Sequence, residues 1–495
     1  MPIFGKDPFA EDREASPTAL EPEDDEASQG GRYGFDEPPR GAGDRTLHDR
    51  PGGEAGPGEP VEAGSTGTGG VETGQQGGGH HDHGDPSEMR PVEEVRAMIL
   101  DRIRPLTPIE LHLQEAHGCV LASDVVAELD IPSFSSSAMD GFAVRASDIA
   151  RAVSDEPVLL RVVGRAPIGR TPDVTVGGGE AVRIATGAPI PAGADCVVPI
   201  EQCIVEGERV HVLRMLPDGA NIRPSGQDVR AGQILVPAGR RLSAPELGLL
   251  ASSGHASVLV HPRPRVVVLS TGDELVEPGR PAPYGMVRDA NSYTIFGALR
   301  DTGVTPFIGG IVRDEVEELK DAVLGLTTRA DAFISSGGVS VGERDVVKKA
   351  FFRRGEIDFY KVAMQPGMPQ GFGLIEDTPY FGLPGNPVSV FVSFEVFIRP
   401  ALLRMMGRRD IFRPEIMAVV EDDISGPRSR LMFQRVRVWR ERGEWRAAST
   451  GPSASNLLST VVRANGLAMV PVGMETAPAG SQVRVMLFRA LEDGS

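Results

Sequence analysis

Apolar residues change their spacing several times along the chain, and each change predicts a different kind of structure. Val92, Val95, Ile99 and Ile103 recur at helical intervals, and Pro91 suits the first turn of a helix. Ordered structure is therefore expected to begin near residue 89 with a helix.

Between residues 140 and 223 the apolar positions fall into short β-rich runs such as Pro157–Val163 and Ala194–Pro199, separated by Gly and Pro turns. This pattern predicts a β-rich inserted domain. A second helix is expected from Ser243, because the Ser cap is followed three residues later by Glu246 and then by several leucines.

The segments on either side of the insertion, 87–139 and 224–262, each contain one of these predicted helices. We expect the two helices to pack together, which would make the segments one discontinuous helical domain. The inserted β-rich domain would then interrupt it in sequence.

Residues 263–408 alternate apolar strands with helix-length segments, as in a parallel α/β sheet with helices on both faces. The predicted elements in chain order are Arg265–Leu269, Ser292–Arg300, Pro306–Val312, Glu315–Leu324, Asp331–Ile334 and Arg344–Arg353. Ligands of such sheets bind at the carboxyl ends of the strands. The fold class expected for the whole chain is multidomain α/β plus β, with this sandwich at its centre.

The two ends of the chain differ from its middle. Residues 409–495 return to short alternating strands around Phe433–Trp439 and Val483–Phe488, which predicts a small barrel-like β domain. Residues 1–86 are rich in Gly, Pro and acidic residues and poor in large aliphatic ones, so they are expected to be a disordered tail.

Charge and composition exclude several classes of partner. The formal net charge is −18, so the overall field does not favour nucleic acid or an anionic membrane. No signal-like leader or apolar run of membrane-spanning length is found, and a cytoplasmic protein is expected. Cys119, Cys196 and Cys203 form neither a disulfide framework nor a C-x-x-C metal motif.

Two turns that follow predicted strands could bind an anion. Ser270–Leu275 combines a Ser/Thr/Gly corner with the carboxylates of Asp273 and Glu274, and residues 335–345 hold three glycines and three serines before Asp345. Backbone amides at such turns bind phosphate, and carboxylates bind Mg²⁺. Considered alone, the first turn is about as well explained as a capped turn with solvated acids. Neither turn fits a P-loop or a dinucleotide fingerprint, which disfavours ordinary NTPases and dehydrogenases.

Several motifs in order make the chain resemble the molybdopterin molybdenumtransferase family, which includes the C-terminal domain of gephyrin. The resemblance covers residues 90–490 and is carried by Ala138–Val144, Thr186–Pro191, Asn221–Arg223, Ser270–Leu275, Ser336–Asp345 and Leu383–Val388. It implies insertion of molybdate into adenylylated molybdopterin with release of AMP. It also implies Mg²⁺ as cofactor, a homodimer with an intermolecular active site, and molybdopterin adenylyltransferase as a partner.

The resemblance also implies roles for individual residues. The implied catalytic residues are Asp273, Asp345, Asp140 and Glu246, of which Asp273 and Asp345 would bind Mg²⁺. The implied substrate-binding residues are Thr186, Gly187, Arg223, Asp228, Ser270, Gly272, Ser335, Gly337, Gly338, Ser340, Gly367, Pro384 and Asn386. Those implied for molybdate are Arg430, Arg435 and Ser455. For Glu246 alone, a helix-start acid stabilised by the helix dipole is the better explanation.

One departure from the family pattern affects the charge of the site. Many members have lysines where this chain has Gln365 and Met368. Lys361 or nearby arginines would have to replace that charge, or molybdate would bind less tightly. A non-catalytic pterin-binding or scaffold protein is therefore the alternative to the enzyme. A third possibility, adenylylation of molybdopterin, leaves the N-terminal motifs unexplained.

Overall fold

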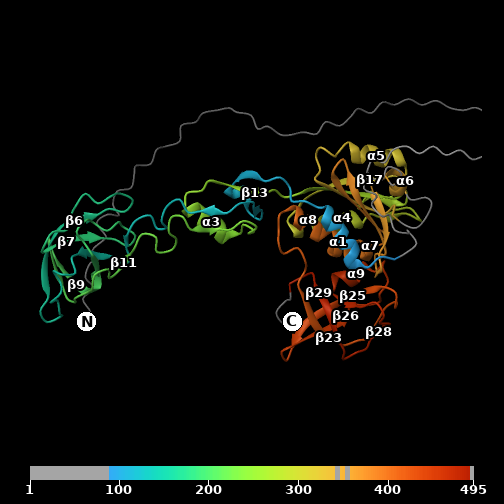
Figure 1. Cartoon of the computed structure of the whole chain (residues 1–495). Helices are drawn as coiled ribbons and strands as arrows, with labels where there is room; N and C mark the ends of the chain where they lie inside the picture. Colours follow the sequence, from blue (N-terminus) through green and yellow to red (C-terminus); the bar gives the residue numbers. More distant parts are fainter. Residues whose placement is uncertain (1–88, 340–345, 352–356, 491–495) are drawn as a thin grey trace, which may run out of the picture. The chain divides into compact units, whose positions relative to one another are not determined.

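The structure is a computed structural model that describes residues 89–339, 346–351 and 357–490 (Figure 1). The expectation of a disordered tail at 1–86 lies outside these residues, as do the predicted site residues Ser340 and Asp345. None of the helices in the described part is both long and apolar enough to cross a membrane.

The inserted domain is β-rich, as expected, and is built around a six-stranded sheet. Its strands, in the spatial order β8-β5-β7-β6-β10-β9, are β8 (Cys196–Pro199), β5 (Gly141–Val144), β7 (Glu180–Ile184), β6 (Val158–Ala166), β10 (Arg209–Val212) and β9 (Cys203–Glu206). The turn η2 (Ile200–Gln202) joins β8 to β9, and β4 (Ser136–Ser137) pairs with β11 (Ile222–Arg223) beside the sheet. A Cβ on Gly141 would lie 1.9 Å from the carbonyl oxygen of Val198, so this close strand pairing requires glycine.

The segments that flank the insertion form a small mixed region rather than a helical domain. Its strands are β1 (Ile109–His112), β2 (Val120–Leu121), β3 (Val125–Val126), β12 (Ile234–Val236) and β13 (Ser257–His261), in the sheets β1-β13-β2 and β12-β3. Its helices are α2 (Leu113–Ala116) and α3 (Ala244–Ser252). Leu121, Leu242, Leu250 and Val260 lie in its core.

The opening helix α1 (Val92–Arg102) belongs to the α/β domain, so the expected packing of this helix against residues near 243–252 is wrong. Val92, Val95 and Ile99 are buried in the same core as Val266 and Leu402. Sequence spacing predicted the apolar face of the helix, but it could not identify which core that face would join.

The central sheet of the α/β domain has the order β17-β14-β18-β22-β21-β19. Its strands are β14 (Arg265–Thr271), β17 (Thr305–Val312), β18 (Ala332–Ser336), β19 (Ile357–Lys361), β21 (Pro369–Ile375) and β22 (Thr378–Leu383). The first four strands in spatial order are parallel, as predicted, whereas β21 runs antiparallel to both neighbours. The short strands β15 (Leu275–Val276) and β16 (Val287–Arg288) pair beside it.

Helices cover both faces of this sheet, which confirms the predicted sandwich. One face packs against α1, α4 (Asn291–Thr302), α7 (Pro387–Ser393), the π-helical turn η4 (Phe394–Ile398) and α8 (Arg399–Met405). The other face packs against α5 (Val316–Leu324) and α6 (Val346–Phe351). Figure 1 shows α1, α4, α7 and α8 grouped together and α5 and α6 separate from them.

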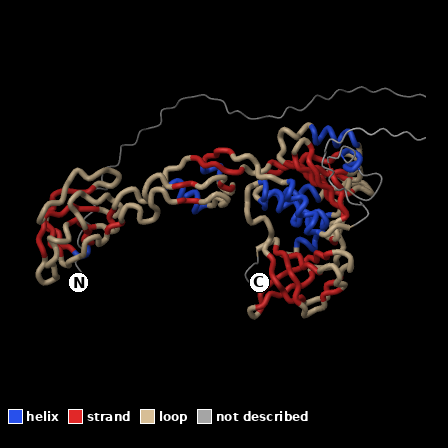
Figure 2. Tube along the Cα trace, in the orientation of Figure 1, coloured by secondary structure: helices blue, strands red, loops and turns tan. Residues whose placement is uncertain are grey.

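The C-terminal domain is a closed barrel, as expected, and its strands form a compact group in Figure 2. Its elements are β20 (Met364–Gln365), β23 (Glu415–Val420), β24 (Ile424–Ser425), β25 (Leu431–Glu441), β26 (Glu444–Ser449), α9 (Leu458–Val462), β27 (Gly466–Val470), β28 (Thr476–Ala477) and β29 (Gln482–Leu487). Pairing of β25 with β27 closes the sheet. The strand β20 comes from the α/β segment and pairs with β25, which joins this segment to the barrel.

Candidate active site

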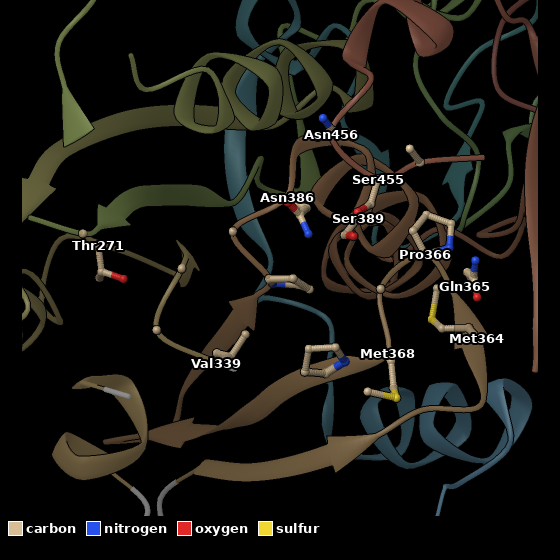
Figure 3. A pocket seen from close by; sticks show the side chains of 18 of the residues that line it. Thr271, Val339, Met364, Gln365, Pro366, Met368, Asn386, Ser389, Ser455 and Asn456 are labelled. Atoms are coloured by element: carbon tan, nitrogen blue, oxygen red, sulfur yellow. The ribbon is translucent and has the colours of Figure 1, made fainter. Parts of the chain in front are cut away.

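A cavity of about 930 Å³ lies at the carboxyl ends of three neighbouring parallel strands, where the sequence predicted a ligand site. Thr271 and Gly272 come from the end of β14, Gly337 and Gly338 from the turn after β18, and residues 384–386 from the turn after β22. The segment 364–369 and the loop 452–456 of the barrel complete the wall. In Figure 3, the side chains of Asn386, Ser389 and Ser455 lie together at one edge of the cavity.

Close packing requires the two glycines of the turn that follows β18. Gly337 and Gly338 have φ angles of +92° and +68°, and a Cβ on Gly337 would lie 2.5 Å from the carbonyl oxygen of Thr271. A Cβ on Gly338 would lie 2.7 Å from the side chain of Val347. The turn therefore sits directly on the end of β14, with its backbone open to the cavity.

Besides Gly338, five of the predicted substrate-binding residues of the α/β domain line the cavity. Those that line the cavity are Gly272, Gly337, Gly367, Pro384 and Asn386.

Two predicted serines do not line the cavity. Ser270 and Ser335 are both fully buried in the sheet. The Ser270 hydroxyl lies 2.8 Å from that of Ser292 and 3.1 Å from that of Ser336, so it links β14, β18 and the start of α4. Ser270 and Ser335 therefore lie behind the cavity wall, and their direct contact with substrate stays a prediction.

Three carboxylates gather at one end of the cavity. Glu274 and Asp314 line it, and Oδ1 of the exposed Asp273 accepts a hydrogen bond from the backbone N–H of Asp314 at 3.3 Å. Burial, together with the negative charges of Asp273 and Glu274, raises the pKa of Asp314. Asp314 was not predicted, although its place just beyond the parallel strand β17 was the available signal.

These acids do not form a complete metal cage by themselves. Among the described residues, no group of three or more His, Cys, Asp or Glu side chains is arranged to hold a metal ion. Their oxygen donors are nevertheless of the type that Mg²⁺ prefers, and Mg²⁺ commonly binds one or two carboxylates together with substrate phosphates. The donor set therefore fits Mg²⁺ shared with a bound phosphate.

A second group of predicted residues lies in the β-rich domain. Oδ1 of Asp140 accepts hydrogen bonds from the N–H and the hydroxyl of Thr186 at 2.7 and 3.0 Å, and Gly187 follows in the same turn. Arg223 on β11 and Asp228 in the next turn are exposed. No described residue of this domain lines the cavity.

Glu246 has a structural role at the start of α3. Its carboxylate accepts hydrogen bonds from the N–H and hydroxyl of Ser243, which completes a capping box, and it pairs with Arg240 at 2.8 Å. The hydrogen bonds from Ser243 and Arg240 lower the pKa of Glu246 to about 2. This geometry supports the helix-start explanation that the sequence left open.

Glu246→Gln is expected to reduce the stability of α3 by about 1 kcal/mol at neutral pH, because the charged cap is lost. The folded-state pKa of Glu246 lies below its ordinary value of 4.5. The stabilisation is therefore present above pH 4.5 and is lost as the pH falls toward about 2. Amide hydrogen exchange of α3 at pH 7 and pH 3 measures both effects, with the exposed Glu128→Gln as control. Unchanged exchange together with lost activity would instead support a catalytic role.

The barrel side of the cavity supplies its positive charge. Arg430 and Ser455 line the cavity, as do Gln365 and Met368, whereas Lys361 does not. Among the described lining residues, Arg430 is the only cation. Many family members have lysines at positions 365 and 368. At the wall of this cavity, Lys361 therefore does not replace the charge of those lysines.

Arg435 is placed differently from the expectation. It is fully buried, and its guanidinium donates to Thr460 and to the carbonyls of residues 452–454. It does not line the cavity. Its donors are directed to these partners within the protein, and a direct contact of Arg435 with molybdate stays a prediction.

Together, the fold and the cavity define a multidomain protein with a ligand site at the carboxyl edge of an α/β sheet, bordered by acids, glycine turns and a barrel loop. Family models match in three consecutive parts: the MoeA N-terminal region (domain I and II) at residues 90–254, a probable molybdopterin binding domain at 267–404, and the MoeA C-terminal region (domain IV) at 417–488.

Individual relatives extend over nearly the whole described chain. Molybdopterin molybdenumtransferase 2 of Mycobacterium tuberculosis is 41% identical over 403 residues, which is 80% of this chain and 99% of the relative. Molybdopterin molybdenumtransferase of Haemophilus influenzae is 34% identical over 81% of this chain and 100% of its own length. The crystal structure of a molybdopterin biosynthesis MoeA protein from Pyrococcus horikosii superposes with a TM-score of 0.71, at 29% identity, covering 81% of this chain and 100% of that one. The chain belongs to the molybdopterin molybdenumtransferase family.

Proposed function

We propose that this chain inserts molybdate into adenylylated molybdopterin, releasing AMP and forming the molybdenum cofactor. The observation that carries the proposal is that glycine turns, carboxylates and Arg430 meet in one cavity. The substrate combines a phosphoanhydride, a pterin dithiolene and an oxyanion. The glycine turns and carboxylates match the phosphoanhydride, and Arg430 with Ser455 matches the oxyanion.

The glycine turn at Gly337 and Gly338 would bind the phosphate end through backbone amides. Asp273, Glu274 and Asp314 would hold Mg²⁺ beside it, together with Asp345, and the ion would neutralise charge on the phosphoanhydride. Arg430 and Ser455 would bind molybdate, because guanidinium and hydroxyl donors match its oxygens.

The protein needs no thiolate of its own for this reaction, since the dithiolene sulfurs become the ligands of molybdenum. Cys119, Cys196 and Cys203 all lie away from the cavity wall. Burial raises the pKa of both Cys196 and Cys203 to about 12, which keeps them as neutral thiols.

The site is proposed to be completed across a homodimer. Asp140 and Thr186 are hydrogen-bonded to each other on the surface of the β-rich domain, which contributes no described residue to the cavity wall. A second subunit would bring these groups to the phosphate end of the substrate. Molybdopterin adenylyltransferase is the proposed supplier of that substrate.

The proposal is tested by incubating the full-length chain with adenylylated molybdopterin, molybdate and Mg²⁺ and measuring AMP. Release of AMP that requires both molybdate and Mg²⁺, with a product that activates a molybdenum-free apoenzyme, is expected. Substrate that is bound but left intact would instead indicate the non-catalytic alternative. Consumption of ATP without adenylylated substrate would indicate the upstream adenylylation.

Restoring a cation to the cavity should strengthen molybdate binding. Gln365→Lys or Met368→Lys would place an ammonium group in a wall where Arg430 is the only described cation. A charge-assisted hydrogen bond is worth about 1.5 kcal/mol, so the KM for molybdate should fall about tenfold. Met417→Lys, at a side chain exposed on β23, is the matched control for added charge. A KM that is unchanged in both cavity variants would place molybdate elsewhere.

A further inference from the structure

Residues 384–386, here called the β22 turn, join β22 to α7 and all line the cavity. Both flanks of this turn are hydrogen-bonded to other parts of the cavity wall. The carbonyl of Leu383 accepts from the N–H of Gly337 at 3.0 Å, and the N–H of Val388 donates to the carbonyl of Ser455 at 3.0 Å. The β22 turn therefore bridges the glycine turn and the barrel.

The β22 turn itself is held by one side chain from another element. Nδ2 of Asn291 donates to the carbonyl of Gly385 at 2.7 Å. Apart from the first helical bond of α7, no other hydrogen bond holds residues 384–386 in the described part of the chain. A Cβ on Gly385 would meet nothing within 4 Å, so close packing at this glycine does not replace the anchor.

Asn291 is well placed to act as an anchor because the start of α4 is itself fixed. The buried carboxylate of Asp289 accepts a hydrogen bond from the N–H of Ser292 at 3.0 Å. The hydroxyl of Ser292 lies 2.8 Å from that of Ser270 on β14, and Leu299 of the same helix is fully buried. Asn291 does not line the cavity, so it reaches the site only through the β22 turn.

We propose that Asn291 is a positioning residue for metal insertion: its amide holds the β22 turn in place between the phosphate end and the molybdate end of the cavity. This inference rests on the proposed function. Insertion requires both substrates to be aligned at once, and a misplacement of about 1 Å can slow such a step about a hundredfold. Asn386 lies beside Ser455 in Figure 3, so a shift of the turn would reach the molybdate side.

Asn291→Asp is the first test, because it keeps the size of the side chain and replaces the N–H donor with an oxygen that repels the carbonyl of Gly385. We expect kcat for AMP release to fall about tenfold, and the KM values for molybdate and adenylylated molybdopterin to change less than about threefold. Each substrate keeps its own binding groups, and only their alignment is lost. Gln114→Glu makes the same amide-to-carboxylate change at an exposed position of α2 and should retain the wild-type kcat.

Asn291→Ala is the second test, because it removes the donor without adding a charge. Its kcat should also fall, by about fivefold, with the same small change in both KM values. If only Asn291→Asp lowers kcat, the effect is due to its charge and the inference is wrong. It is also wrong if Asn291→Ala, shown to be folded by its thermal unfolding, has the wild-type kcat, or if both variants alter KM alone.

Hydrogen exchange separates failure of the inference from failure of the proposed function. If the wild type releases no AMP, the proposed function fails. Asn291→Ala should still accelerate exchange of the amides of Gly337 and Val388 compared with Gln114→Glu, because their hydrogen bonds flank the turn that loses its anchor. Unchanged exchange at both amides would overturn the positioning role whatever the activity.

Discussion

Asp273→Asn is expected to lower AMP release by about a thousandfold while the protein remains folded. The Asp273 carboxylate is exposed beside Glu274 and Asp314, at the acid end of the cavity. An amide keeps the shape of the side chain but provides no charged oxygen to Mg²⁺. Loss of a group that stabilises developing charge commonly reduces turnover by this order.

The measurement is AMP release at saturating adenylylated molybdopterin, molybdate and Mg²⁺, with thermal unfolding recorded in parallel. Asp301→Asn, at an exposed position of α4 in the same domain, is the control and should retain wild-type turnover. Wild-type turnover of Asp273→Asn would remove this carboxylate from the mechanism.

Mixing two inactive variants should restore activity if the active site is shared between subunits. Asp140 lies in the β-rich domain and Asp273 in the α/β domain, and the described residues that line the cavity all belong to the α/β and barrel segments. In a dimer of Asp140→Ala with Asp273→Ala chains, one site combines both substitutions and the other combines none. The second site should therefore be active.

The expected recovery is about a quarter of wild-type activity after complete subunit exchange, because half of the dimers are mixed and each has one intact site out of two. Exchange is verified independently with differently tagged chains. Mixed dimers that form and remain inactive would show that Asp140 and Asp273 act within one subunit, or that Asp140 is only structural.

The position of the cavity could be predicted from sequence because it depends on local patterns. Apolar strands followed by glycine-rich turns identified the ends of β14 and β18, and parallel pairing places these ends at one edge of the sheet. The same patterns could not show that β21 runs antiparallel or that α1 packs on the α/β domain. Both depend on contacts between residues distant in sequence.

Side-chain roles were harder to predict than their positions in the chain. Ser270, Ser335 and Arg435 have the chemistry of ligand-binding residues, yet their side chains are buried within the protein. Only the packing of the strands determines which face such a residue occupies. Asp314 was missed for the converse reason, since it lies in no recognised motif but is brought to the cavity by the end of β17.

The most direct test of the account is a crystal structure of the full-length chain with adenylylated molybdopterin and molybdate. The account predicts the phosphoanhydride between Gly337, Gly338 and the acids, and molybdate between Arg430 and Ser455. Substrate bound outside this cavity, or molybdate at its acid end, would contradict it.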